Sequence, residues 1–236
     1  MRVLIACEES QVVCKAFRER GHEAYSCDII DCSGGHPEWH IKQDVLQILN
    51  PVRHEIYSPY FGSKEWKGIT FHTMDEKLHI IEGKWDMIIA FPPCTFMSKA
   101  GARWMFPKGK LSQERYAKAM EAKEFFMRIF NADCDRIAIE NPRPLRIVEL
   151  PDPQQVIQPY MFGHPYSKAT CLWLKNLPLL EPTDVLTEYK PYCPSNTGGV
   201  SRGQSHNRGG AVRGDDAVNR AKTFVGVGNA MSSRWG

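Results

Sequence analysis

Cys94 occupies a position that suits nucleophilic chemistry. It follows residues 87–91, an apolar run with the length and composition of a buried parallel strand. Pro92 and Pro93 cannot donate to a hydrogen-bonded ladder, so the strand should end at Phe91. We therefore expect Cys94 just beyond the carboxyl end of a strand, where open α/β sheets bind ligands. The alternative is a buried cysteine that packs as a small hydrophobic residue.

Glu140 would supply the second half of the chemistry. It follows residues 137–139, a second short apolar run, and is itself followed by Asn141 and Pro142. Two neighbouring parallel strands would bring Cys94 and Glu140 to the same edge of a sheet. Because a thiolate and a carboxylate repel each other, the carboxyl group would have to act as an acid or a hydrogen-bonding group. The alternative is a carboxylate in a loop or at the start of a helix.

The remaining elements suit an α/β arrangement around these two strands. Residues 2–7 and 23–27 are expected as strands, joined by a helix that starts near Ser10 and ends at Gly21. An acidic residue such as Asp28, at the end of the second strand, can hydrogen-bond a ribose, although a turn residue gives the same pattern. The clearest helix covers residues 112–130, and residues 168–174 alternate as a strand does.

Three short motifs resemble those of the DNA cytosine-C5 methyltransferases. Residues 92–98, Pro-Pro-Cys-Thr-Phe-Met-Ser, resemble the family's Pro-Cys motif, usually Pro-Pro-Cys-Gln-x-Phe-Ser. Residues 140–142, Glu-Asn-Pro, resemble its Glu-Asn-Val motif, and residues 228–231, Gly-Asn-Ala-Met, are similar to its final Gly-Asn-Ala-Val motif. The three motifs occur in the family's order and extend over most of the chain. The chain thus resembles a small, phage-like member of this family.

The resemblance implies a fold and an activity. The fold would be a Rossmann-like α/β core of the S-adenosylmethionine-dependent methyltransferases, with a mostly parallel sheet and flanking helices. The activity would be methylation of cytosine C5 in DNA, with S-adenosylmethionine as cofactor and a covalent bond between the cysteine and C6 of the base. Glu140 would hydrogen-bond the base, and the base would have to be flipped out of a duplex or be single-stranded.

The resemblance also assigns site residues. The catalytic residues would be Cys94 and Glu140, and no metal is expected. The cofactor would contact Ala6, Cys7 and Glu8 at the end of the first strand, and the acidic residues Asp28 and Asp44. It would also contact Pro93 of the first motif and Asn229 of the last motif. The substrate would contact Ser98, Arg103, Asn141 and Lys168.

The sequence departs from the family in three places. The loop after the first strand lacks the family's Phe-x-Gly-x-Gly pattern. There is also no Gln-x-Arg-x-Arg motif, and Lys168 would substitute for an arginine of that motif. Residues 180–216 form only an irregular insertion in place of a large target-recognition region. Two alternatives therefore stay open: the same chemistry on RNA or a free cytosine nucleotide, and a non-catalytic nucleic-acid-binding or decoy module.

Size and composition are those of an ordinary globular protein. With 236 residues, 42% hydrophobic and 24% charged, one domain covering residues 1–236 is expected. The net charge of +3 permits a nucleic-acid partner without requiring one. No signal peptide precedes the first strand and no apolar stretch is long enough for a membrane span, so the eight cysteines are expected to be reduced, in the cytoplasm and away from membranes.

Several stretches have no regular pattern. Residues 50–83 show no clean periodicity and are expected to be a long connection. Cys27, Cys32, His36 and His40 form a zinc-like set whose spacing fits no standard zinc finger. Residues 196–210 are rich in glycine and basic residues, and a last helix is expected at residues 216–222, before a loop through residues 224–229.

Overall fold

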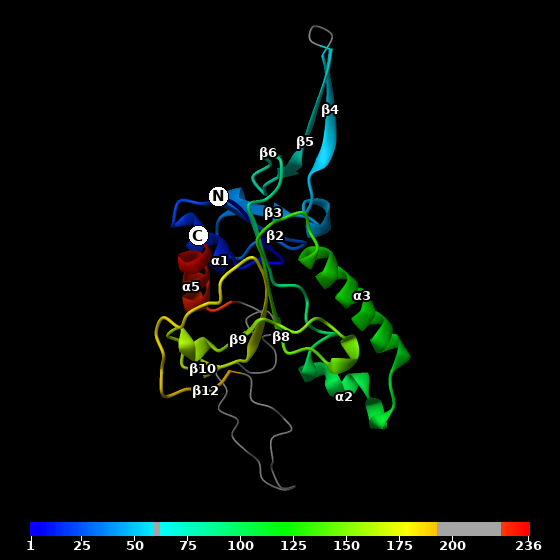
Figure 1. Cartoon of the computed structure of the whole chain (residues 1–236), viewed down its shortest axis with the longest axis vertical. Helices are drawn as coiled ribbons and strands as arrows, with labels where there is room; N and C mark the ends of the chain where they lie inside the picture. Colours follow the sequence, from blue (N-terminus) through cyan, green and yellow to red (C-terminus); the bar gives the residue numbers. More distant parts are fainter. Residues whose placement is uncertain (59–61, 193–222) are drawn as a thin grey trace.

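A seven-stranded sheet forms the centre of the molecule (Figure 1). The computed structural model describes residues 1–58, 62–192 and 223–236. In spatial order the strands are β3 (His40–Lys42), β2 (Glu23–Asp28), β1 (Arg2–Ala6), β7 (Met87–Ala90), β8 (Ile137–Pro142), β11 (Thr170–Lys175) and β9 (Gln155–Ile157). β11 is antiparallel to both of its neighbours, and the other pairings are parallel. The prediction of an α/β fold with a mostly parallel sheet is confirmed, and the arrangement is compatible with a Rossmann-like fold.

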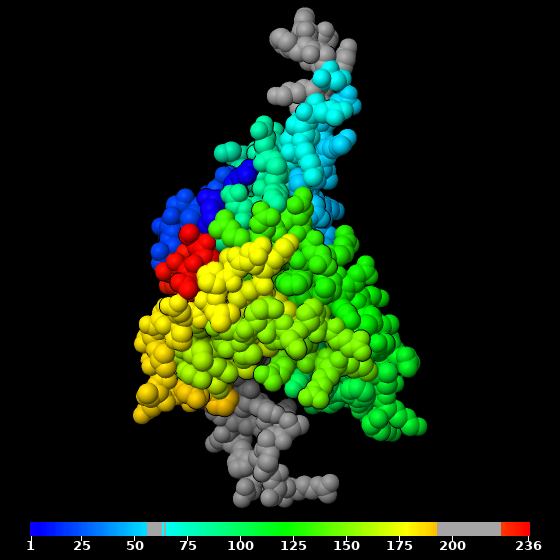
Figure 2. All heavy atoms as spheres, viewed as in Figure 1, coloured from blue at the N-terminus to red at the C-terminus, as the bar shows by residue number. Residues whose placement is uncertain are grey.

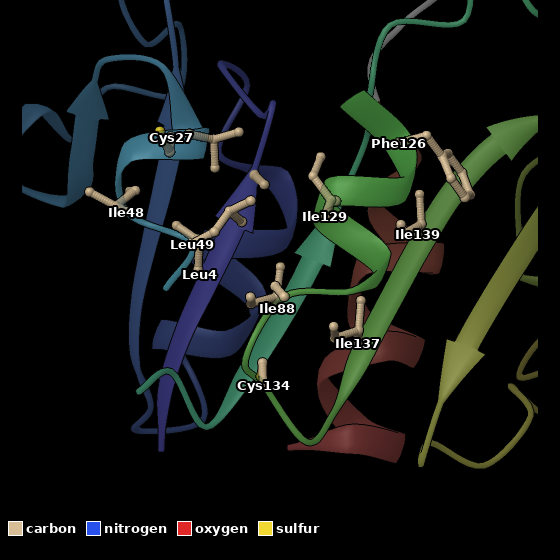
Figure 3. Close-up of a cluster of buried hydrophobic side chains, with 14 of the residues drawn as sticks. Leu4, Cys27, Ile48, Leu49, Ile88, Phe126, Ile129, Cys134, Ile137 and Ile139 are labelled. Atoms are coloured by element: carbon tan, nitrogen blue, oxygen red, sulfur yellow. The ribbon is translucent and has the colours of Figure 1, made fainter. Parts of the chain in front are cut away.

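Helices cover both faces of the sheet, which explains why its central strands are continuously apolar. On one face Leu4 and Ile88 belong to a core that includes Phe126 of the longest helix (Figure 3). On the other face Ile5 and Met87 pack with the first and last helices. These three helices are α3 (Gln113–Phe130), α1 (Val12–Arg18) and α5 (Val225–Trp235).

The expectation of an unstructured connection over residues 50–83 is wrong. This segment forms a three-stranded antiparallel sheet of β4 (Val52–Ser58), β5 (Gly62–His72) and β6 (Leu78–Glu82). Its base packs Ile69, Phe71 and Ile81 into the main core, while β4 and the first half of β5 extend away from the body (Figures 1 and 2). The sequence of residues 50–83 lacks the clean alternation that usually indicates strands, so local pattern did not predict this sheet.

The ends of α1 and α3 differ in how well local sequence predicted them. Ser112 caps α3, because its side chain accepts a hydrogen bond from the amide nitrogen of Arg115 at 3.4 Å. At α1 the expected cap by Ser10 is wrong. The residue at the cap position is Gln11, in a left-handed conformation, and the side chain that binds the first amide groups belongs to Glu8. As expected, the turn after α1 contains Gly21, at φ +79°.

The C-terminal segment also differs from expectation. The helix expected at residues 216–222 lies outside the described residues, as does most of the insertion at residues 180–216, including the glycine-rich residues 196–210. Residues 225–235, expected in part as a loop, form α5. Its glycines permit close packing, since a Cβ on Gly226 would lie 2.0 Å from the carbonyl oxygen of Phe162. This tertiary contact outweighs the low helix propensity of glycine.

β11 is not the alternating strand expected from residues 168–174. It begins at Thr170, so Lys168 precedes it, and residues 170–174 are all buried between β8 and β9. The remaining short elements are β10 (Tyr166–Ser167), β12 (Lys190–Pro191) and α2 (Ala102–Met105). No helix in the described part of the chain is both long and apolar enough to cross a membrane.

Candidate active site

Cys94 and Glu140 lie at the carboxyl edge of two neighbouring strands. β7 and β8 are parallel, with Ala90 opposite Ile139. Cys94 comes just after the two prolines that follow β7, and Glu140 is the residue after Ile139. The two side chains are close enough for the charge of Glu140 to raise the pKa of the Cys94 thiol. The structure therefore brings together the two residues that the sequence singled out.

The loop that carries Cys94 is fastened to β8. The side-chain amide of Asn141 donates to the carbonyl oxygen of Pro92 at 2.8 Å, in a buried position. The amide nitrogen of Ser98 donates to the carbonyl oxygen of Cys94 at 2.9 Å, and Ser98 pairs with Pro144 in an isolated bridge. Asn141 and Ser98 are only 1% and 5% exposed. Asn141 and Ser98 therefore hold the loop, and their expected contact with the substrate stays a prediction.

The same loop is fastened to α3 on its other side. Arg115 donates from a guanidinium nitrogen to the carbonyl oxygen of Thr95 at 2.9 Å, and its guanidinium group lies 5.0 Å from the centre of the Phe96 ring. Such a cation–π contact adds to the hydrogen bond. Cys94 thus sits between two anchored points, Pro92 and Thr95, which favours a defined thiol position.

The electrostatics of the pair favour one negative charge over two. Burial and the Glu140 carboxylate raise the pKa of Cys94, while Lys168 opposes this shift. Burial also raises the pKa of Glu140, against the lowering effects of Lys168 and of the nearby Thr170 side chain. A proton on Glu140 therefore favours the thiolate of Cys94, and the Lys168 ammonium group favours either anion.

Lys168 is held close to this pair by aromatic side chains. Its ammonium nitrogen lies 5.9 Å from the ring centres of Tyr192 and of Phe224. Lys168, Glu140 and Phe224 line a small cavity of about 20 Å³. The Thr170 hydroxyl donates to the carbonyl oxygen of Lys168 at 3.1 Å, which fixes the backbone there. Lys168, which was expected to substitute for an arginine of the resembled family, therefore lies next to both Cys94 and Glu140.

A larger cavity of about 350 Å³ lies beside the pair, at the ends of the first strands. It lies where the strand order reverses, between β1 and β7, which is the usual ligand position in open α/β sheets. Four of the residues expected to bind the cofactor line it: Cys7, Asp28, Asp44 and Pro93. Pro93, which lines this cavity, is the residue directly before Cys94.

The thiol of Cys7 faces the acidic side of this cavity. Burial raises the pKa of Cys7 to about 12, and the charges of Asp28 and Asp44 contribute to the shift. This thiol therefore stays protonated near neutral pH, in contrast to what a nucleophile requires. The backbone of Cys7 is left-handed, at φ 58°, a conformation usually given to glycine. The loop thus adopts a glycine-like conformation without the glycines of the resembled family.

Sequence reasoning missed the apolar walls of the larger cavity. They come from Ile29, Val45, Ala122 and Phe125. Ile29 is 72% exposed, which is unusual for a large aliphatic side chain next to a cavity. Two isoleucines directly after the strand-end Asp28 were a signal in the sequence, whereas nothing local indicated that α3 would supply Phe125.

Three of the expected site residues do not line the two cavities beside the pair. Ala6 is fully buried in the core and does not line the cavity. Asn229 is exposed on α5, a helix that packs against α1. Arg103, expected to bind the substrate, is exposed on α2 with its guanidinium group 4.6 Å from the centre of the Trp104 ring. The structure brings neither Arg103 nor Asn229 to the cavities beside Cys94 and Glu140.

Glu8, which was also expected to contact the cofactor, caps α1 with its carboxylate and does not line the larger cavity. It accepts hydrogen bonds from the amide nitrogens of Val13 at 2.6 Å and Cys14 at 3.2 Å. Glu8 is only 4% exposed, and burial raises its pKa to about 7 although these two bonds oppose the shift. This carboxylate binds the helix terminus that a phosphate or carboxylate ligand would otherwise approach.

The substitution Glu8→Gln is expected to remove a pH dependence of stability. Because the folded state raises this pKa from 4.5 to about 7, it binds the proton more tightly than the unfolded state does. The resulting stability is fully present below pH 4.5 and is lost as the pH rises through about 7. The shift corresponds to on the order of 3 kcal/mol. Urea unfolding between pH 5 and 8 measures it, with Glu19→Gln as a surface control; the same loss in Glu8→Gln as in the wild type would contradict it.

The zinc-like set does not converge on a metal site. Both ring nitrogens of His40 are engaged, one with the Ser26 hydroxyl at 2.8 Å and the other with the carbonyl oxygen of Ile30 at 3.0 Å. The thiol of Cys27 bonds to the carbonyl oxygen of Gln43. In the described ranges, no three or more His, Cys, Asp or Glu side chains are grouped so that they could hold a metal ion.

Comparison of the chain with protein-family models and with curated protein sequences gives no match. The functional assignment therefore depends on the residues and on the geometry described above.

Proposed function

We propose that this protein is an S-adenosylmethionine-dependent methyltransferase that acts on C5 of cytosine in DNA. One observation carries the proposal: Pro93 lines the cavity at the strand-order reversal, and the next residue, Cys94, lies beside a partly buried carboxyl group and an ammonium group. A methyl donor and a nucleophile for the base would thus be held side by side. The three motifs that resemble the cytosine-C5 methyltransferases support the same reaction.

The larger cavity fits the cofactor in size and in chemistry. Its volume of about 350 Å³ is within the range of small-molecule sites. Ile29, Val45 and Phe125 offer apolar surfaces for a flat heterocycle, and the strand-end carboxylate of Asp28 suits the hydroxyl groups of a ribose. Asp44, which caps residues 45–47 through a bond from the Leu46 amide at 2.9 Å, also lines the cavity. When bound, S-adenosylmethionine supplies an electrophilic methyl group.

Cys94 and Glu140 would activate the base between them. C5 of cytosine is a poor nucleophile, so the thiolate first forms a bond to C6, and the electron pair of the C5–C6 double bond becomes available at C5. The raised pKa of Glu140 favours a protonated carboxyl group, which would hydrogen-bond N3 and stabilise the negative charge that develops in the ring. After C5 has been methylated, loss of the C5 proton and departure of the thiolate restore the ring.

The substitution Asp28→Ala is expected to weaken S-adenosylmethionine binding by about tenfold or more. The reason is the loss of a charge-assisted hydrogen bond, which is worth roughly 1.5–3 kcal/mol. Calorimetric titration measures the affinity. Asp31→Ala is the matched control, since Asp31 lies three residues after Asp28 and pairs with Lys42, but does not line the cavity. Unchanged affinity in Asp28→Ala would refute this cofactor position.

The class of substrate needs a separate experiment. Methyl transfer to duplex DNA, single-stranded DNA, RNA and free cytidine nucleotides should be compared with the same enzyme preparation. Transfer to DNA supports the proposal, and transfer to RNA or nucleotides alone would keep the chemistry and change the substrate. Absence of any S-adenosylmethionine binding by the wild-type protein would favour a non-catalytic binding module.

A further inference from the structure

A third cavity, of about 590 Å³, has no part in the chemistry described so far. The segment that follows Glu140 lines it, together with Leu145 and the buried Cys171. Three basic side chains line it: Lys99, Arg143 and Arg146. Two acidic residues, Glu149 and Asp152, lie on the same lining, so the excess charge is positive.

The three cations are gathered on the lining of one cavity and have no acidic partner within the described ranges. No ion pair involves Lys99, Arg143 or Arg146 among the residues that the structure describes. Cations that line a cavity without acidic partners are suited to an anionic ligand, and the planar guanidinium group matches a phosphate in particular.

The rim of this cavity is rigid. Pro144, Pro151 and Pro153 line it, and each proline restricts its own backbone. The indole nitrogen of the buried Trp173 donates to the carbonyl oxygen of Pro151 at 2.7 Å, which fastens the rim to β11. A rigid rim lowers the entropy that binding would otherwise cost.

The cavity adjoins the two segments that carry the catalytic pair. Lys99 is five residues after Cys94 and Arg143 is three residues after Glu140, and the amide nitrogen of Lys99 donates to the carbonyl oxygen of Arg143 at 3.0 Å. Five residues of extended chain span at most about 18 Å, the length of roughly five nucleotides along one strand. A nucleic-acid strand with its target base at Cys94 could therefore extend past these cations.

From this placement we infer that Lys99, Arg143 and Arg146 form a binding site for backbone phosphates of the nucleic-acid substrate, close to the target base. The inference rests on the proposed function, because it takes the substrate to be a polynucleotide. Phosphate contacts would position the strand without reading its sequence. This suits a chain that resembles a family with large recognition regions but has only a small insertion.

The test measures DNA binding separately from catalysis. Fluorescence anisotropy with a short cytosine-containing DNA duplex gives the affinity over a series of salt concentrations. For Arg143→Gln combined with Arg146→Gln, we expect the affinity at 0.1 M salt to fall more than about tenfold. The slope of log affinity against log salt should become shallower by about 1 for each lost contact, and therefore by about 2. Arg146→Gln alone should give about half of the change in slope. This single variant keeps the Arg143 guanidinium group in its place beside Cys171.

A charge-matched control removes two cations elsewhere. Lys77→Gln with Arg128→Gln alters the turn between β5 and β6 and the last turn of α3, both outside this cavity. Equal salt slopes for the two double variants would overturn the inference. If the wild-type protein bound S-adenosylmethionine but no DNA at any salt concentration, the DNA substrate would be refuted together with this site. Loss of DNA binding in the cavity variant with unchanged cofactor affinity supports it.

Discussion

Cys94→Ala is expected to lower methyl transfer to cytosine by several orders of magnitude, to the background level. Without the thiolate there is no addition to C6, and C5 stays a poor nucleophile. Cys94→Ser should be equally inactive, because a hydroxyl group here lacks the thiolate character of cysteine. Transfer of a labelled methyl group to DNA measures the effect. Since Cys94 is only partly buried, both variants should fold normally.

The covalent intermediate gives an independent readout of the same prediction. In DNA that carries 5-fluorocytosine, the fluorine at C5 prevents the final elimination, so wild-type protein with cofactor should form an adduct that survives denaturation. The adduct should be absent in Cys94→Ala and present in Cys32→Ser, which removes a thiol outside both cavities. Full methyl-transfer activity in Cys94→Ala would contradict the proposed mechanism. An adduct mapped to Cys7 or Cys171 would keep the reaction and show that another thiol performs it.

Glu140→Gln should reduce turnover by on the order of a hundredfold or more, because the amide cannot stabilise the developing charge as the carboxyl group does. It should also shift the titration of Cys94. The charge of Glu140 contributes to the raised pKa of this thiol, so its removal should move the pH dependence of Cys94 alkylation to lower pH. The shift in alkylation tests whether the Glu140 charge acts on the thiol, and the loss of turnover tests its catalytic role.

Two further variants test the direction of the shift. Lys168→Met removes the cation that lowers the pKa of Cys94, so alkylation should then require a higher pH. Glu149→Gln removes a carboxylate from the neighbouring cavity and should leave the profile of Cys94 unchanged. If Glu140→Gln and the wild type had the same alkylation profile, the proposed interaction between the two groups would be wrong.

Local sequence determined the strands that carry Cys94 and Glu140. The apolar runs before Cys94 and Glu140 lie in strands buried on both faces, where polar residues would have no partners. Pro92 and Pro93 end the strand before Cys94, because a proline has no amide hydrogen to donate to the sheet. The helix over residues 113–130 follows from its apolar spacing and from the side-chain cap of Ser112. Each of these features depends on residues that are near one another in the chain.

Only the tertiary structure decided the surroundings of the pair. Phe125 of α3 lines the larger cavity, and the Glu8 carboxylate accepts hydrogen bonds from amide groups of α1. The small sheet of β4, β5 and β6 forms through antiparallel pairing with little local signal, and α5 tolerates its glycines because close packing requires them. These contacts join residues that are distant in sequence, so they stabilise the structure only once the chain has folded.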